Sequence, residues 1–141
     1  MAEHIQLHEL PQRRLEATVS LVESGLDRME RLLAEGGEDG IVRAVENGLA
    51  PDLQASLLAE IRQLRRELES FAQQFSLQRR PVDIRQVLNA ELSSAWVMLE
   101  NCRPERMKGF GVEFDSVTRD ALDESVGNLV MRVLTIRAKL R

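Results

Sequence analysis

Apolar residues recur at alternating steps of three and four along most of the chain, which is the spacing of one face of an α-helix. The first such stripe predicts a helix over residues 11–35. Pro11 suits its first turn and Gly36 suits its end, because proline needs no helical partner there and glycine adopts the conformation that terminates a helix. The same spacing predicts three more long helices, over residues 51–77, 83–102 and 115–140.

A shorter segment lies between the first two long helices. Ile41, Val42, Val45 and Leu49 would fall on one side of a helix, and Asn47 is followed by a glycine that breaks regular structure. The pattern therefore predicts a short extra helix over about residues 39–48, laid across an end or flank of the long ones.

The order of these elements points to one fold class. Four helices of similar length with short connections are typical of an antiparallel four-helix bundle, and a chain of 141 residues is long enough for one core. Aromatic residues make up only 4% of the chain, which argues against a β-sandwich or barrel. We expect an all-α protein with a flexible N-terminal tail over residues 1–10 and a single domain over residues 11–141.

The third and fourth long helices carry more apolar residues than one bundle face needs. Residues 95–99 read AWVML, so apolar side chains surround that part of the helix, and the helix over 115–140 has a similar excess. Either the short helix or a second chain must cover this surplus. We expect a homodimer through these two helices. Its contact candidates are Trp96, Met98, Val130, Met131 and Leu134, with an ordinary core position as the alternative for Trp96.

Residues that catalyse reactions or hold metals are scarce. The chain has two histidines, His4 and His8, and both precede the first helix. Its single cysteine, Cys102, ends an apolar stripe and is expected to be a small buried side chain. No Glu-x-x-His pair of a di-iron bundle, no phosphate-binding glycine loop and no nucleophile–histidine set is present. The sequence thus predicts no enzyme activity, no cofactor and no metal site.

Two basic regions are candidates for contacts with a partner. The connection over residues 103–114 mixes basic and apolar side chains between glycines, which is typical of a contact surface. The residues that we assign to it are Arg103, Arg106, Met107, Lys108 and Phe110. The alternative is that the basic residues cap helix ends and Phe110 closes the end of the bundle. A second, arginine-rich pole gathers Arg79, Arg80, Arg137, Lys139 and Arg141.

These features favour a non-enzymatic protein–protein interaction module, such as an adaptor, a chaperone-like protein or a regulatory bundle. One alternative is a small-ligand or cofactor-binding bundle with an apolar pocket near Trp96. Another is a nucleic-acid-associated regulator that uses the arginine-rich pole, although the net charge of −4 opposes it. No apolar run reaches the roughly 18 residues of a membrane span, and with one cysteine the expected location is the cytoplasm.

Overall fold

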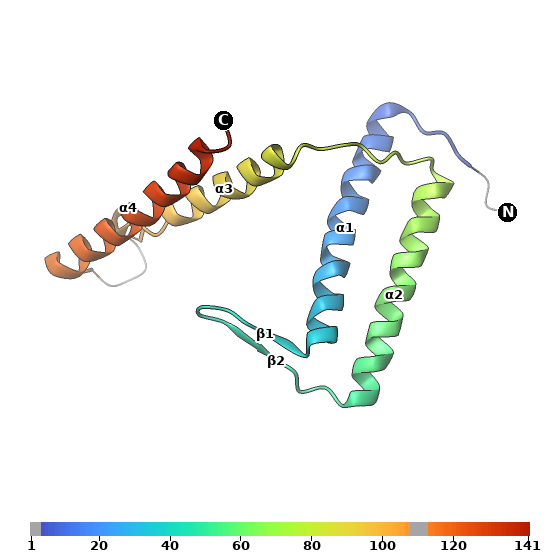
Figure 1. Ribbon diagram of the computed structural model, residues 1–141, viewed down its shortest axis with the longest axis horizontal. Coiled ribbons are helices and arrows are strands. Elements are labelled where there is room, and N and C mark those ends of the chain that lie inside the picture. Colours follow the sequence, from blue (N-terminus) through green and yellow to red (C-terminus); the bar gives the residue numbers. More distant parts are fainter. Residues whose placement is uncertain (1–3, 108–112) are drawn as a thin grey trace. The chain divides into compact units, whose positions relative to one another are not determined.

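The computed structural model describes residues 4–107 and 113–141, and these are mostly helical (Figure 1). The four long helices predicted from the sequence are confirmed, each within three residues at either end. They are α1 (Glu9–Glu35), α2 (Pro51–Gln74), α3 (Ile84–Glu100) and α4 (Ser116–Ala138). A single 3₁₀ turn, η1 (Pro104–Met107), follows α3.

Aspartate side chains cap the starts of α3 and α4, and a glycine follows the end of α1. The Asp83 carboxylate accepts a hydrogen bond from the Arg85 N–H (2.7 Å), and the Asp115 carboxylate accepts one from the Thr118 N–H (2.7 Å). Both bonds satisfy backbone donors that the first turn of a helix leaves free. Gly36 follows α1 with φ of 75°, a left-handed conformation that glycine adopts without strain.

Residues 37–46 form a β-hairpin, so the predicted short helix over residues 39–48 is wrong. Strands β1 (Gly37–Asp39) and β2 (Ala44–Glu46) pair antiparallel, with Glu38 opposite Val45. The Gly40 N–H donates to the Arg43 carbonyl oxygen at 2.7 Å and closes the turn between them. We call residues 37–46 the β arm. In Figure 1 it extends away from the ends of α1 and α2 that it connects.

The backbone at Gly37 explains why this segment is extended. Its φ is 133°, and a Cβ at that position would lie 2.4 Å from the Val45 carbonyl oxygen. Only glycine fits, and it directs the chain out of α1 into a strand. Ile41, Val42 and Val45 are β-branched and favour extended structure. A helix of ten residues without tertiary support would also be too short to be stable.

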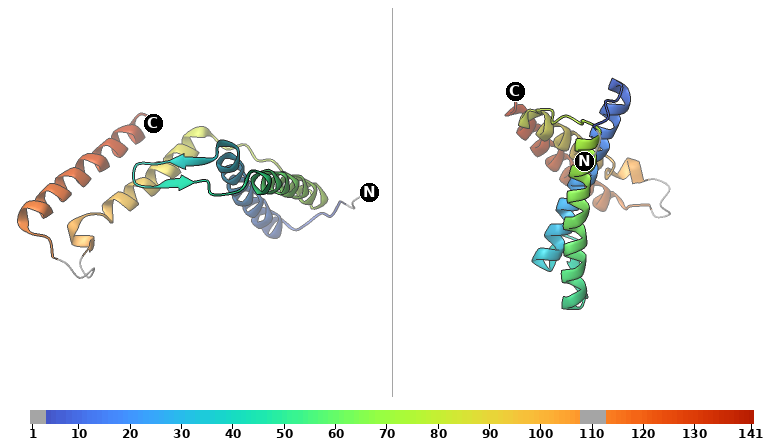
Figure 2. Two further views of the ribbon diagram at one scale, coloured as in Figure 1. Left: turned by 90° about the horizontal axis from the view of Figure 1, so that it is seen from below. Right: turned by 90° about the vertical axis from the view of Figure 1, so that its right-hand side faces the viewer.

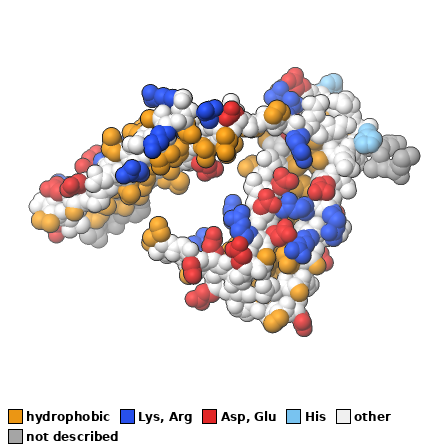
Figure 3. All heavy atoms as spheres, in the orientation of Figure 1, with side chains coloured by type: hydrophobic (Ala, Val, Ile, Leu, Met, Phe, Trp, Pro, Cys, Tyr) orange, Lys and Arg blue, Asp and Glu red, His pale blue; other side chains and the backbone are white. Residues whose placement is uncertain are grey.

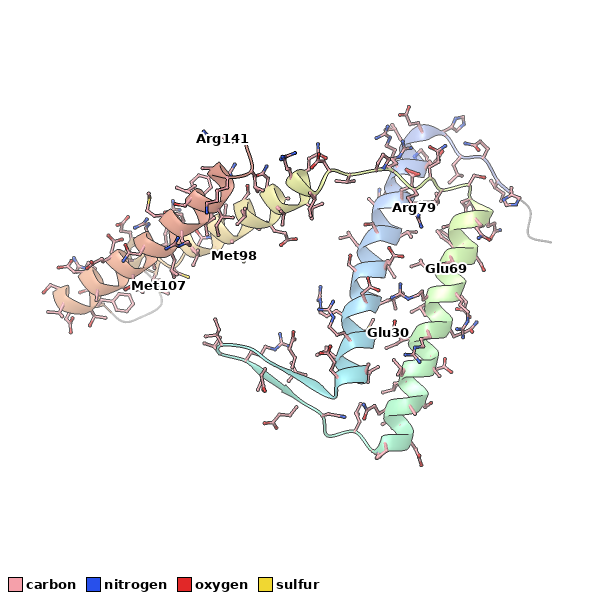
Figure 4. The ribbon with its side chains drawn as sticks, in the orientation of Figure 1. Glu30, Glu69, Arg79, Met98, Met107 and Arg141 are labelled. Carbon is pink, nitrogen blue, oxygen red and sulfur yellow. The ribbon has the colours of Figure 1, made fainter. Side chains whose placement is uncertain are left out.

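The chain divides into two compact units, residues 1–79 and residues 80–141. In the first unit α1 packs along α2 (Figure 2). Leu26 of α1 is fully buried. Arg65 of α2 forms ion pairs with Asp27 and with Glu30 (3.5 Å) of α1. Figure 4 labels Glu30 on the side of α1 that faces α2. Such surface ion pairs contribute little free energy and mainly fix the register of the two helices.

The N-terminal residues of the first unit lie against the end of α2. The Ile5 N–H donates to the Gln74 carbonyl oxygen (2.6 Å), and the His4 Nδ1 lies 2.9 Å from the Gln73 carbonyl oxygen. Gln12 is buried at the same place, and its amide donates to the Ser76 carbonyl oxygen at 3.3 Å. These bonds attach residues 4 and 5 to α2.

The second unit consists of α3 and α4, which lie side by side in opposite directions in Figures 1 and 2. Its buried core is a row of valines on α4, Val126, Val130 and Val133, at steps of four and three. This spacing keeps all three on one face of the helix, and that face packs on α3.

Candidate interaction surfaces

Arg103 joins the two helices of the second unit where the chain leaves α3. Its Nε donates to Glu100 at 2.8 Å and its Nη1 donates to Asp123 of α4 at 3.0 Å. The guanidinium also passes over Gly127, where an added Cβ would lie 3.8 Å from Nη1. A planar group with donors on several sides suits this position, because it can hold two carboxylates at once.

The ionisation of these groups reflects the same contacts. Hydrogen bonds from Arg103 lower the pKa of Glu100, with a smaller contribution from the Trp96 side chain. Hydrogen bonds to Glu100 and then to Asp123 raise the pKa of Arg103. Both groups are therefore charged at neutral pH, and they form an ion pair. Arg103 thus links α3 to α4.

The structure separates the residues that the sequence assigned to a partner-binding loop. Arg103 has its donors occupied within the unit, Arg106 is exposed on η1, and Met107 is half-buried at the end of η1. Lys108 and Phe110 lie outside the described residues. Of the predicted set, only Arg106 is thus a described, exposed side chain.

One face of the second unit carries exposed aliphatic side chains from both helices. Leu129 of α4 is 53% exposed although it neighbours the buried Val130, and Ile136 follows it seven residues later. On α3, Ile84 and Leu88 are exposed at a step of four. We call these four residues the Leu88–Leu129 face. Figure 3 shows hydrophobic side chains gathered along both helices.

Helical geometry places the two halves of this face on the same side of the unit. At about 100° per residue, Leu88 lies about 80° around α3 from Trp96, whose ring lies against Arg137 of α4. Leu129 lies about 70° around α4 from the valines that face α3. This rotation has the same sense about α4 as the rotation of Leu88 has about α3. Because the helices are antiparallel, equal rotations bring both residues to one side. The result is an apolar surface two helices wide.

The opposite side of the unit is also apolar. Val97 of α3 and Met131 of α4 are exposed there, and Met131 is 61% exposed. Leu134, three residues after Met131 on α4, lies on the same side and is half-buried. Met131 follows Leu129 by two residues, or about 200° around the helix, which separates the two surfaces. We call Val97, Met131 and Leu134 the Val97–Met131 face.

The five predicted dimer contacts fall in different places. Met131 and Leu134 belong to the Val97–Met131 face. Met98 is exposed on α3 and is labelled in Figure 4. Trp96 is partly exposed and points toward α4, where the Arg137 guanidinium lies 5.9 Å from the centre of its ring. Val130 is 5% exposed and lies in the α3–α4 core, so its assignment to a dimer surface is corrected.

A pocket of about 400 Å³ opens at the end of the second unit where α4 finishes. Asn89 of α3 lines it, together with Leu134, Arg137, Ala138, Leu140 and Arg141 of the chain around the end of α4. Aliphatic and guanidinium groups therefore share its walls. Residues 125–141 contain four Lys and Arg side chains and no Asp or Glu.

The first unit has one apolar face of its own. Exposed aliphatic side chains repeat at steps of seven on each helix, beside the residues that pack α1 on α2. They are Val22 and Met29 of α1 and Leu57 and Leu64 of α2, and we call them the Met29–Leu64 face. The same rotational argument puts both pairs on one side of this unit.

The described residues contain no cluster of side chains suited to a metal ion. Within residues 4–107 and 113–141, no group of three or more His, Cys, Asp or Glu side chains could hold a metal ion. Cys102 is exposed, not buried as predicted, and its thiol donates to the Met98 carbonyl oxygen at 3.4 Å. The helix α3 ends at Glu100, two residues before the predicted end, so Cys102 lies beyond the helix.

Comparison with known proteins gives no assignment: no family model, no curated protein and no solved structure matches this chain. Among the described helices, none combines the length and the apolar character that crossing a bilayer requires.

Proposed function

We propose that this protein is a non-enzymatic interaction module that forms a homodimer through α3 and α4 and binds a further protein. One observation carries the proposal. The α3–α4 unit is apolar on two opposite faces, with the buried valines of α4 between them. A helical hairpin that served only one bundle would need one apolar face, and exposed apolar surface shared by two helices is typical of association sites.

We propose that the four long helices form an antiparallel four-helix bundle and one domain over residues 11–141. Two observations support it. The Leu88–Leu129 face and the Met29–Leu64 face are each two helices wide, and each carries large apolar side chains at the spacing of a bundle seam.

The second face of the α3–α4 unit is then left for a second copy. The Val97–Met131 face has contributions from both helices, with Val97 of α3 57% exposed and Met131 of α4 61% exposed. A twofold axis would place the same residues of both copies in contact.

Sedimentation equilibrium on matched variants tests the dimer. Val97→Gln combined with Met131→Gln should weaken dimerisation at least tenfold, because it places amide groups in an apolar contact. Leu21→Gln is the control, since Leu21 is an exposed leucine of α1 outside both α3–α4 faces. Circular dichroism shows that both variants remain helical. Equal dissociation constants for the double variant and the control would refute the proposed interface.

A further inference from the structure

The pocket at the end of α4 lies within the second unit, because every residue that lines it belongs to residues 80–141. We propose that this pocket binds a small amphiphilic anion, namely an aliphatic chain of medium length that ends in one carboxylate. The site needs a single chain. It therefore goes beyond the proposed homodimer and does not depend on it.

The end of α4 brings aliphatic and charged side chains to one place. Leu134, Arg137 and Ala138 follow one another at steps of three and one, which keeps them on one face of the helix. The backbone continues to turn beyond the helix, since the Leu140 N–H donates to the Arg137 carbonyl oxygen at 3.0 Å. This turn brings Leu140 and Arg141 to the same pocket. Figure 4 labels Arg141 there.

Three side chains of the pocket carry N–H donors that the described part of the chain leaves without an acceptor. There, Arg137 and Arg141 form no ion pair, and the Asn89 amide forms no hydrogen bond. Asn89 reaches the pocket from α3, which packs along α4. A guanidinium offers donors only and is always charged in proteins. The group that suits these donors is therefore an anion with two acceptor oxygens, such as a carboxylate.

Trp96 holds one of the two guanidiniums in position. The Arg137 guanidinium lies 5.9 Å from the centre of the Trp96 ring, which is a cation–π distance. A ring stacked on the face of a guanidinium leaves the N–H groups at its edge free to donate. Arg137 is also half-buried, so little of its freedom remains to be lost when an anion binds.

The rest of the pocket suits an aliphatic chain. Leu134 and Leu140 are half-buried, and their remaining exposed surface lines the pocket beside Ala138. The volume of about 400 Å³ lies within the range of roughly 300–1,000 Å³ that small-molecule sites have. An inorganic anion would leave these aliphatic groups in water, and an uncharged chain would not engage the guanidiniums. A molecule with both parts uses the whole lining.

Titration of the full chain with sodium octanoate tests the proposal. Trp96 is the only tryptophan of the sequence, and it contacts Arg137, so its fluorescence reports binding in the pocket. The fluorescence should change to saturation with octanoate. Acetate and octanol each lack one part of the ligand, and each should bind at least about tenfold more weakly. Each methylene added between butanoate and octanoate should tighten binding about two- to fourfold, because it buries further apolar surface.

Matched variants place the ligand in the pocket. Arg141→Gln should weaken octanoate binding at least about fivefold, since it removes a charged donor. Arg132→Gln is the control, because it removes the same charge from an exposed position of α4 outside the pocket, and binding should not change. Circular dichroism shows that both variants remain helical. The double variant Val97→Gln with Met131→Gln should bind octanoate like the parent, because neither residue lines the pocket.

Four results would each overturn the proposal. They are the absence of a saturable change, equal dissociation constants for Arg141→Gln and Arg132→Gln, octanol that binds as tightly as octanoate, and loss of binding in the double variant. The last result would place the ligand on the Val97–Met131 face. None of them bears on the proposed homodimer, which sedimentation without ligand measures separately.

Discussion

Val130 and Met131 are neighbours on α4, but Val130 lies in the core and Met131 lies at the surface. Val130 is 5% exposed and Met131 is 61% exposed. Val130→Ala removes two buried methyl groups, worth about 0.8 kcal/mol each, and leaves a cavity that adds to the cost. The better helix propensity of alanine returns about 0.5 kcal/mol. We therefore expect a loss of about 2 kcal/mol in the free energy of unfolding, whereas Met131→Ala should cost less than about 0.5 kcal/mol.

Urea unfolding, followed by circular dichroism at submicromolar and at high micromolar protein concentrations, measures both effects. Dimerisation stabilises the folded chain only at the higher concentration. Val130→Ala should lower stability at both concentrations. Met131→Ala should lower it only at the higher one, because its side chain contributes to the interface and not to the core. The reasoning is refuted if Met131→Ala costs as much as Val130→Ala at the lower concentration.

Three further predictions concern the ends of helices, the arm and pH. Asp83→Ala should cost about 1 kcal/mol in urea unfolding by removing the N-cap of α3, and Asp83→Asn should restore most of it; equal losses would contradict the capping role. Gly37→Ala should destabilise the β arm, because the new Cβ would meet the Val45 carbonyl oxygen. Faster hydrogen exchange of the Gly40 amide would report this loss of stability, and unchanged exchange would argue against the hairpin. The pKa of Glu100 and the pKa of Asp115 are lowered, by hydrogen bonds from Arg103 and from Thr118. A lowered carboxyl pKa stabilises the folded state above the unfolded pKa and this stabilisation is lost as the pH falls through the folded pKa. The urea midpoint should thus decrease as the pH falls below about 4.5, and Glu100→Gln should reduce that decrease.

The long helices were predictable because their signals are local. These signals are the apolar steps of three and four, Pro51 at the start of α2, and the caps Asp83 and Asp115. Each acts within a few residues. The β arm was not predicted because Ile41, Val42 and Val45 match a helical spacing by coincidence. The better signal was the run of glycines at 36, 37 and 40, since two of them have positive φ.

The candidate surfaces were harder to predict because they depend on contacts distant in sequence. Arg103 looked like a partner-binding residue, and only its approach to Asp123, twenty residues later, shows that it joins α3 to α4. Val130 and Met131 are both apolar, and the sequence does not tell which of them faces α3. The surplus of apolar residues on these two helices was visible in the sequence. Its division into two opposite faces required the positions of the helices.

The central claim is that the chain associates with a second copy of itself. Light scattering coupled to size-exclusion chromatography, across the micromolar concentration range, measures the molar mass directly. One chain has a mass of 16.0 kDa. The account predicts a mass that rises with concentration and reaches twice that of one chain. A mass that stays at that of a single chain throughout would contradict it.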